Sequence, residues 1–560
     1  MAMRVSGAGR SAVAGVALGV ALLAGASACS KSESKKQSPA EPAQAAERRE
    51  QAAKLTAPPL FANIPADTPY AMASFEPIPL SYWEKWGPMV RTLLDSVPQP
   101  PASEDPPARF AIALLRDLRA NMSQDGLRKL LGIDAKMRFA IYGVGIVPVM
   151  RIELADEKAL LATVERLQRE SGLALPTASV SGRSYWRFGD AKGVVVVAVS
   201  EGQLIAAGGP TAMVDKVLPI ILGIEKPNPS MADGGAIKAV AAQHGFAGYG
   251  IAYVDSANLL KVLTAASFFR PDNPVPPACV EQMGAMARRF PRFAFGYDDI
   301  SDKRVGMRFV LETEAALTAR LKQLVVEVPG LLAGAPAEPA IGSFGLGMDL
   351  DKARLLALDA VTAIEAIGTA CGDASATEDM AQARASLSQP LPPGLDKIRG
   401  GMVSVLDGDL GPDGKPRAVE AFAVVAADDP SALVKLVREQ APPGAVPELA
   451  ADGQYHQVVP EGAVPGLGAI RAAIKPHALV AAVGARGSDA AERSLGRTGA
   501  SPLFYVAYDY AKIVEKITKA TGSSALSPGE TMILNSFGTI GMWGYPTDHG
   551  FAMAVSVDFR

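Results

Sequence analysis

The strongest constraint on the fold is an order of local patterns that occurs twice along the chain. Each occurrence has a short strand with helices after it, an aspartate-capped helix, a run of strands, and a strand that ends at an aspartate before a helix. The clearest matched pairs are Leu160 with Leu433, Leu204 with Leu479, and Asp255 with Asp509, which lie 273, 275 and 254 residues apart. The pattern predicts two tandem copies of one fold, although α+β units also resemble one another for generic packing reasons.

The strands of each copy come mostly as adjacent hairpins, with helices between the groups. Met137–Tyr142 and Ile146–Leu154, for example, are two strands joined by a glycine-containing turn. This order favours antiparallel pairing over a parallel array with helical crossovers. The predicted fold class is therefore α+β, with two similar domains, 58–330 and 331–560, each a mainly antiparallel sheet covered by helices. Alternation over 505–510 suggests one packed sheet face and one partly wet face.

The chain begins with a segment typical of export. Arg4 and Arg10 form a short cationic region, and an apolar stretch from Ala12 to Ala28 ends in small residues before Cys29. The run Leu22–Cys29 resembles the lipobox of bacterial lipoproteins. A plain signal peptide that ends near a cysteine and an uncleaved anchor are the alternatives, but the stretch is short and rich in Ala and Gly for a membrane span.

The lipobox resemblance implies that residues 1–28 are removed as a signal peptide and that Cys29 becomes an acylated N-terminus. Ser30 at the next position implies the outer membrane of a Gram-negative cell envelope. Residues 29–57 are charged and rich in Pro, Ala and Gln, so we expect a disordered tether, in which 47–50 could form a fraying helix. We see no further apolar run long enough to span a membrane, so the lipid would be the only anchor.

The composition fits globular domains and excludes some partners. The chain is 49% hydrophobic and 20% charged, which is enough apolar residue to fill cores in two or three domains. Its formal charge is −3, and losing Arg4 and Arg10 with the signal makes it −5. This slightly acidic balance argues against nucleic acid as a partner, because nucleic-acid binding needs a concentrated basic surface.

The two cysteines beyond Cys29, Cys279 and Cys371, predict one disulfide. An oxidising envelope favours the pairing, and the bond would connect the end of the first copy to the start of the second. Two separate buried thiols are the alternative.

Residues that could carry chemistry do not form a recognisable motif. The segment Asp407–Gly414 has alternating carboxylates, but Gly411 and Ala418 stand where calcium ligands are needed, so we interpret it as a turn. No short-spaced ligand pairs predict a metal site, and three Gly-x-Gly fragments lack the rest of a dinucleotide fingerprint, so no cofactor is expected. The four histidines, His244, His456, His477 and His549, lie far apart, which leaves open only a triad assembled in space. The four tryptophans, Trp83, Trp86, Trp186 and Trp543, are expected to pack in cores or on sheets.

The opening Ile64–Tyr70 and the duplicated pattern resemble envelope lipoproteins of Gram-negative bacteria that carry an Ile-Pro-Ala-Asp-Thr-Pro-Tyr-like start and a duplicated α+β ectodomain. The resemblance covers most of the mature chain, rests on structural motifs and implies no activity. The sequence therefore predicts a non-enzymatic, lipid-anchored binding or scaffolding module, whose partner is an envelope protein or ligand. A hydrolase acting on envelope material and a carrier of an apolar ligand are the alternatives.

Overall fold

The computed structural model of the chain describes residues 42–79, 91, 104–134, 136–265, 275–332, 340–391, 394–411, 416–440, 447–464, 466–497, 499–521 and 536–560. The predicted signal segment, Cys29 and the first part of the predicted tether lie outside these residues. The described chain divides into two compact units. Unit 1 contains Ala43–Ala266 and Ala294–Val305, and unit 2 contains Ser267–Phe293 and Gly306–Arg560.

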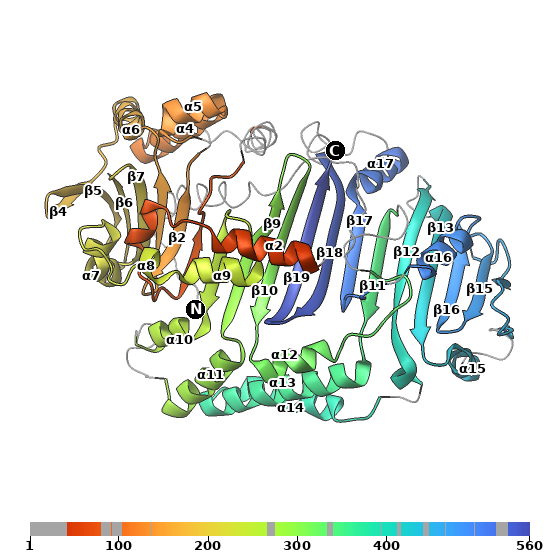
Figure 1. Cartoon of the computed structure of the whole chain (residues 1–560). Helices are drawn as coiled ribbons and strands as arrows, with labels where there is room; N and C mark the ends of the chain where they lie inside the picture. The colour runs from red at the N-terminus through yellow and green to blue at the C-terminus, as the bar shows by residue number, and fades with distance from the viewer. Residues whose placement is uncertain are drawn as a thin grey trace. The chain divides into compact units, whose positions relative to one another are not determined.

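Unit 1 is built on an antiparallel sheet in the order β8–β1–β2–β3–β7–β6–β5–β4 (Figure 1). Alternate side chains of its central strands, such as Tyr142 and Val149, are buried, as the period of two requires. The strands are β1 (Tyr70–Ala73), β2 (Phe139–Val144), β3 (Val147–Glu153), β4 (Thr177–Val180), β5 (Arg183–Gly189), β6 (Gly193–Ser200), β7 (Gln203–Pro210) and β8 (Ile251–Asp255).

Aspartates and serines begin several helices of unit 1. The Asp156 side chain accepts a hydrogen bond from the Ala159 N–H (3.1 Å), and Ser123 caps α5 in the same way (3.1 Å). Arg116, Arg166, Asp117 and Glu170 join α4 to α6 in one ion-pair network. The helices are α2 (Pro42–Ala53), η1 (Pro59–Asn63), α4 (Pro106–Ala120), α5 (Gln124–Leu131), α6 (Glu157–Ser171), α7 (Thr211–Ile221), α8 (Met231–Gly234), α9 (Ala236–His244) and α10 (Ser256–Ala265).

Unit 2 is built on an antiparallel sheet in the order β19–β18–β17–β11–β12–β13–β16–β15–β14 (Figure 1). Its strands are β11 (Gly342–Gly347), β12 (Ile398–Leu410), β13 (Pro416–Ala427), β14 (His456–Val459), β15 (Ile470–Lys475), β16 (Ala478–Val483), β17 (Phe504–Asp509), β18 (Phe537–Thr547) and β19 (Gly550–Phe559). Two further strands, β9 (Arg292–Ile300) and β10 (Arg304–Glu312), contribute residues to both units.

One face of the unit 2 sheet forms a hydrophobic core. This core contains Met402, Phe422, Val480 and Tyr505 of the sheet. It also contains Ala490 of α16, the helix that packs against β13 and β16. The helices of unit 2 are α11 (Pro277–Arg289), α12 (Ala315–Lys322), α13 (Leu350–Cys371), α14 (Ala374–Leu387), η2 (Leu395–Lys397), α15 (Pro430–Gln440), α16 (Gly487–Leu495) and α17 (Tyr510–Thr521). The predicted α+β class with antiparallel sheets is confirmed.

Two features differ from the sequence-based expectation. Residues 42–53 of the expected disordered tether form helix α2, because Ala52 and Leu55 are buried and the backbone of Arg49 lies close to Gly245. Residues 275–293 and 306–330, assigned to the first domain, belong to unit 2, because α11 packs against α13 and α12 packs against β18 and β19. In the part of the chain that the structure describes, no helix has the length and apolarity needed to cross a membrane.

Candidate functional site

An apolar surface covers the side of the unit 2 sheet that faces away from its core. Side chains alternate between the two faces of a strand, so the register identifies those that share this side. The central row crosses five strands from β19 to β12 and consists of Val555, Met542, Val506, Phe344 and Val403. We call the surface built on these five strands the apolar face.

The rows on either side of the central row are also free of charge. One consists of Val557, Ile540, Tyr508, Gly342 and Val405, and the other of Met553, Gly544, Phe504, Leu346 and Gly401. The Tyr508 hydroxyl is the only polar side-chain group among these fifteen positions. The central row continues as Ala423 of β13 and Ala481 of β16.

The apolar face is exposed at its centre. Phe344 is 55% exposed and Val403 is 47% exposed, whereas their neighbours Ser343 and Met402, which point to the core, are 8% and 7% exposed. The solvent side of an antiparallel sheet usually carries polar side chains. Large exposed apolar patches of soluble proteins commonly mark binding sites, so this face is the leading candidate for one.

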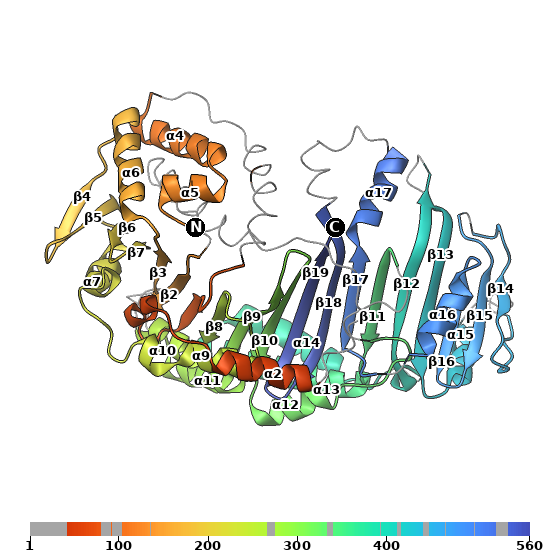
Figure 2. The ribbon, with the colours of Figure 1, turned by 45° about the horizontal axis from the view of Figure 1, so that its top comes forward.

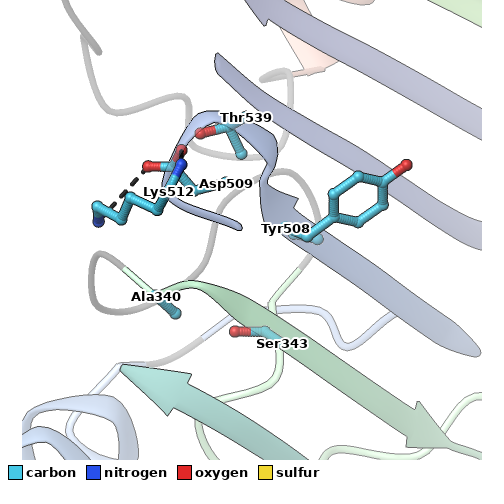
Figure 3. Close-up of a pocket in the computed structure, with 7 residues that line it drawn as sticks. Ala340, Ser343, Tyr508, Asp509, Lys512 and Thr539 are labelled. Atoms are coloured by element: carbon cyan, nitrogen blue, oxygen red, sulfur yellow. Dashed lines mark hydrogen bonds and ion pairs between the residues drawn. The ribbon is translucent and has the colours of Figure 1, made fainter. Parts of the chain in front are cut away.

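A small pocket lies where β11 begins and β17 ends (Figure 3). Asp509 starts α17: its Oδ1 accepts hydrogen bonds from the Lys512 N–H (3.0 Å) and from Arg560 Nη2 (3.2 Å). Figure 3 shows the Tyr508 ring pointing away from this pair. The cavity volume is about 80 Å³, whereas small-molecule sites usually have about 300–1,000 Å³. The pocket is lined by Ala340, Ser343, Ala507, Tyr508, Asp509, Lys512 and Thr539.

Ion pairs lie at the same end of the sheet. Lys516 of α17 binds Asp407 (2.9 Å) and Asp409 (3.0 Å) of β12. The hydrogen bond from Lys516 lowers the pKa of Asp407, and the two carboxylates raise the pKa of Lys516. Asp407 and Asp409, considered above as calcium ligands, thus lie in strand β12 and form ion pairs with a lysine of α17. Residues 412–415 of the same segment lie outside the described structure.

A buried arginine in unit 1 was missed by the sequence analysis. Arg151 of β3 is 1% exposed and donates to the Tyr142 hydroxyl (2.9 Å), Gln203 Oε1 (2.8 Å) and the carbonyl oxygen of Ile221 (2.7 Å). No carboxylate of the described residues pairs with it, and burial raises the pKa of Tyr142, so that hydroxyl stays neutral. Its position in the strand could have predicted that Arg151 is buried. Arg151 follows Val147 and Val149 at a period of two, so all three side chains lie on the inward face of β3.

The other predicted residues fall as follows. Cys279 and Cys371 are at disulfide distance, with sulfur atoms 2.01 Å apart, and both belong to unit 2. His244 is buried with its ring 5.4 Å from that of Phe246, whereas His456 is exposed and lies 3.0 Å from the Asp452 carboxylate. Trp543 packs against the unit 2 core and Trp186 is half-buried on β5, whereas Trp83 and Trp86 lie outside the described residues.

The described residues contain no group of three or more His, Cys, Asp or Glu side chains placed to hold a metal ion. Comparison with known proteins adds no assignment, because no protein-family model, no curated protein and no solved structure matches the chain.

Proposed function

We propose that the chain is a non-enzymatic, lipid-anchored protein of the bacterial cell envelope, held at the outer membrane, which binds its partner through the apolar face. The observation that carries the binding role is the uncharged surface centred on Phe344 and Val403. These two side chains are exposed, although the surface has the composition of a core. The lipobox-like run before Cys29 and the serine after it support the anchor and its location. A carrier of an apolar ligand is the second candidate, and the same surface favours it.

Cys29→Ala is expected to release the protein from the membrane fraction, because the acyl chains are the proposed anchor and each buried methylene contributes about 0.8 kcal/mol to membrane binding. The measurement is fractionation of cell envelopes followed by intact mass. Ser27→Thr, which leaves the cysteine in place, is the matched control and should stay with the membrane. A Cys29→Ala protein that has the processed mass and still sediments with membranes would contradict the proposed anchor.

We also propose that the chain holds two copies of one fold. The strand order β8–β1–β2–β3–β7–β6–β5 in unit 1 and the order β17–β11–β12–β13–β16–β15–β14 in unit 2 support this. The matched positions support it too. Leu204 lies opposite Ile152 in the unit 1 sheet, and Leu479 lies opposite Val425 in the unit 2 sheet. Leu204 and Leu479 are 275 residues apart and Ile152 and Val425 are 273 apart, the same separations as in the sequence pattern.

Equivalent backbone contacts extend this support to the aspartate-capped helices. The Asp255 N–H donates to the carbonyl oxygen of Pro69 (2.8 Å), and the Asp509 N–H donates to the carbonyl oxygen of Ile341 (2.9 Å). The carboxylate of each aspartate caps the helix that follows it. Superposing the two sheets in an experimental structure tests the proposal, since Leu204 should overlay Leu479 on the same strand.

A further inference from the structure

We infer that the apolar face binds the acyl chain of a membrane phospholipid. This rests on the proposed function, which places the protein at a membrane and assigns its binding role to this face, and it specifies the partner.

The occupant must be free of polar groups along the length it buries. The backbone groups of β11, β17 and β18 are used in their ladders on both sides, and the fifteen side-chain positions offer one hydroxyl, that of Tyr508. Protein interfaces carry about one hydrogen bond per 100–200 Å². This face cannot supply such bonds, whereas a hydrocarbon chain requires none.

The face also suits a flexible ligand in shape. Five strands about 4.8 Å apart give a width of about 19 Å, along which a chain can lie across the strands. Met542 and Met553 are unbranched and adaptable, so they can follow a chain that has no fixed shape. Glycines at 342, 401 and 544 leave low points between the larger side chains, although Phe504 and Phe551 cover the one at Gly544.

The charged groups begin where the apolar rows end. Lys516 of α17 binds Asp407 and Asp409 near the end of β12, and α17 lies at that end of the sheet (Figure 2). At the other end, where β12 begins, Arg399 binds Asp428. An apolar surface bordered at both ends by charged, hydrated groups matches an amphiphile, whose tail lies on the sheet while its headgroup stays in water. A wholly apolar ligand has no polar group that could interact with these charged side chains.

The test is photo-cross-linking to a phospholipid. The full chain carrying Cys29→Ala, which removes the proposed anchor, is mixed with phosphatidylethanolamine–phosphatidylglycerol vesicles that contain a phospholipid with a diazirine in its acyl chain. After illumination, cross-linked peptides are mapped by mass spectrometry. We expect the label on β11, β12, β17 and β18. Because the anchor is absent, this result is independent of whether Cys29 is acylated, which the fractionation experiment decides separately.

Phe344→Lys and Val403→Lys should each lower the cross-linking yield at least about tenfold, because each places an unpaired charge in the path of the hydrocarbon. Leu355→Lys is the matched control. Leu355 is 43% exposed and lies on α13, which packs against α11, α14 and η2, so its yield should not change. Val403→Thr is nearly isosteric and should give an intermediate loss with an unchanged circular dichroism spectrum, which separates lost binding from lost folding.

Equal yields from Phe344→Lys and the parent chain, or labels confined to peptides outside the five strands, would overturn the inference. A third result would also overturn it: no lipid label, together with self-association that Phe344→Lys abolishes. That outcome would identify a second copy of the chain as the occupant.

Discussion

Arg151→Met is expected to lower the free energy of unfolding of unit 1 by about 3 kcal/mol or more, because it leaves three buried polar groups without their hydrogen-bond donor. Methionine keeps the apolar stem of the arginine but donates no hydrogen bond. The Tyr142 hydroxyl, Gln203 Oε1 and the Ile221 carbonyl would each lose a donor inside the protein. An unsatisfied buried polar group costs about 1–3 kcal/mol, and three of them are at stake.

The Ile221 carbonyl explains why an arginine without a carboxylate is tolerated there. Ile221 is the last residue of α7, and the carbonyl groups at a helix C-terminus carry partial negative charge that favours a cation. In the proposed duplication, the counterpart of Arg151 at the 273-residue separation is Val424, which is buried in an apolar core. The polar cluster around Arg151 therefore occurs in unit 1, whereas the matching strand of unit 2 has an apolar side chain at this position.

Urea unfolding followed by circular dichroism measures the effect, and Arg187→Met is the matched control. Arg187 binds Asp215 through two hydrogen bonds, but the side chains are 30% and 48% exposed. Exposed ion pairs contribute about 0–1 kcal/mol, so this variant should unfold almost as the parent does. If both variants lose less than about 1 kcal/mol, the buried cluster has no special role in stability.

Replacing both Cys279 and Cys371 by serine is expected to destabilise unit 2 by about 4–5 kcal/mol. Their separation of 92 residues corresponds to a loop-closure entropy of that size in the chain-entropy relation. The bond connects α11 to α13, which also pack against each other. The measurement is urea unfolding with and without reductant: the parent should lose stability on reduction, whereas the double-serine variant should not respond.

Labelling of free thiols in unfolded, unreduced protein provides the independent check. Mature oxidised protein should label at neither position, and two labelled cysteines would refute the disulfide. Each of the two variants also serves as a control for the other. The arginine variant should shift an unfolding transition of unit 1, whereas the double-serine variant should shift an unfolding transition of unit 2. A chain with two compact units is not expected to unfold in a single two-state step, so the transitions should be fitted separately.

Local signals in the sequence predicted much of the fold because they act within a few residues. The caps at Asp156 and Asp509 accept the expected N–H groups of the following helices. The packed and partly wet faces expected around Tyr505 were also correct, since Tyr505 and Ala507 are buried while Val506 and Tyr508 are only half-buried. The pairing of the two cysteines followed from their number and the expected compartment.

Other features depended on distant contacts. The composition of residues 42–57 is that of a spacer, yet Ala52 and Leu55 are buried, and the burial offsets the entropy of ordering. The candidate binding surface was missed for a related reason. In β17 the residues at both parities are apolar or aromatic, so the period of two predicts a strand without telling which side is covered.

The sequence by itself determined the element types, the helix starts and the antiparallel class, because propensity, capping and alternation are encoded locally. The tertiary structure alone decided that Arg151 meets three neutral acceptors and that Phe344 lies exposed on a surface with the composition of a core. The physical reason is that burial is set by which elements pack against a strand, and those elements come from positions far away in the chain.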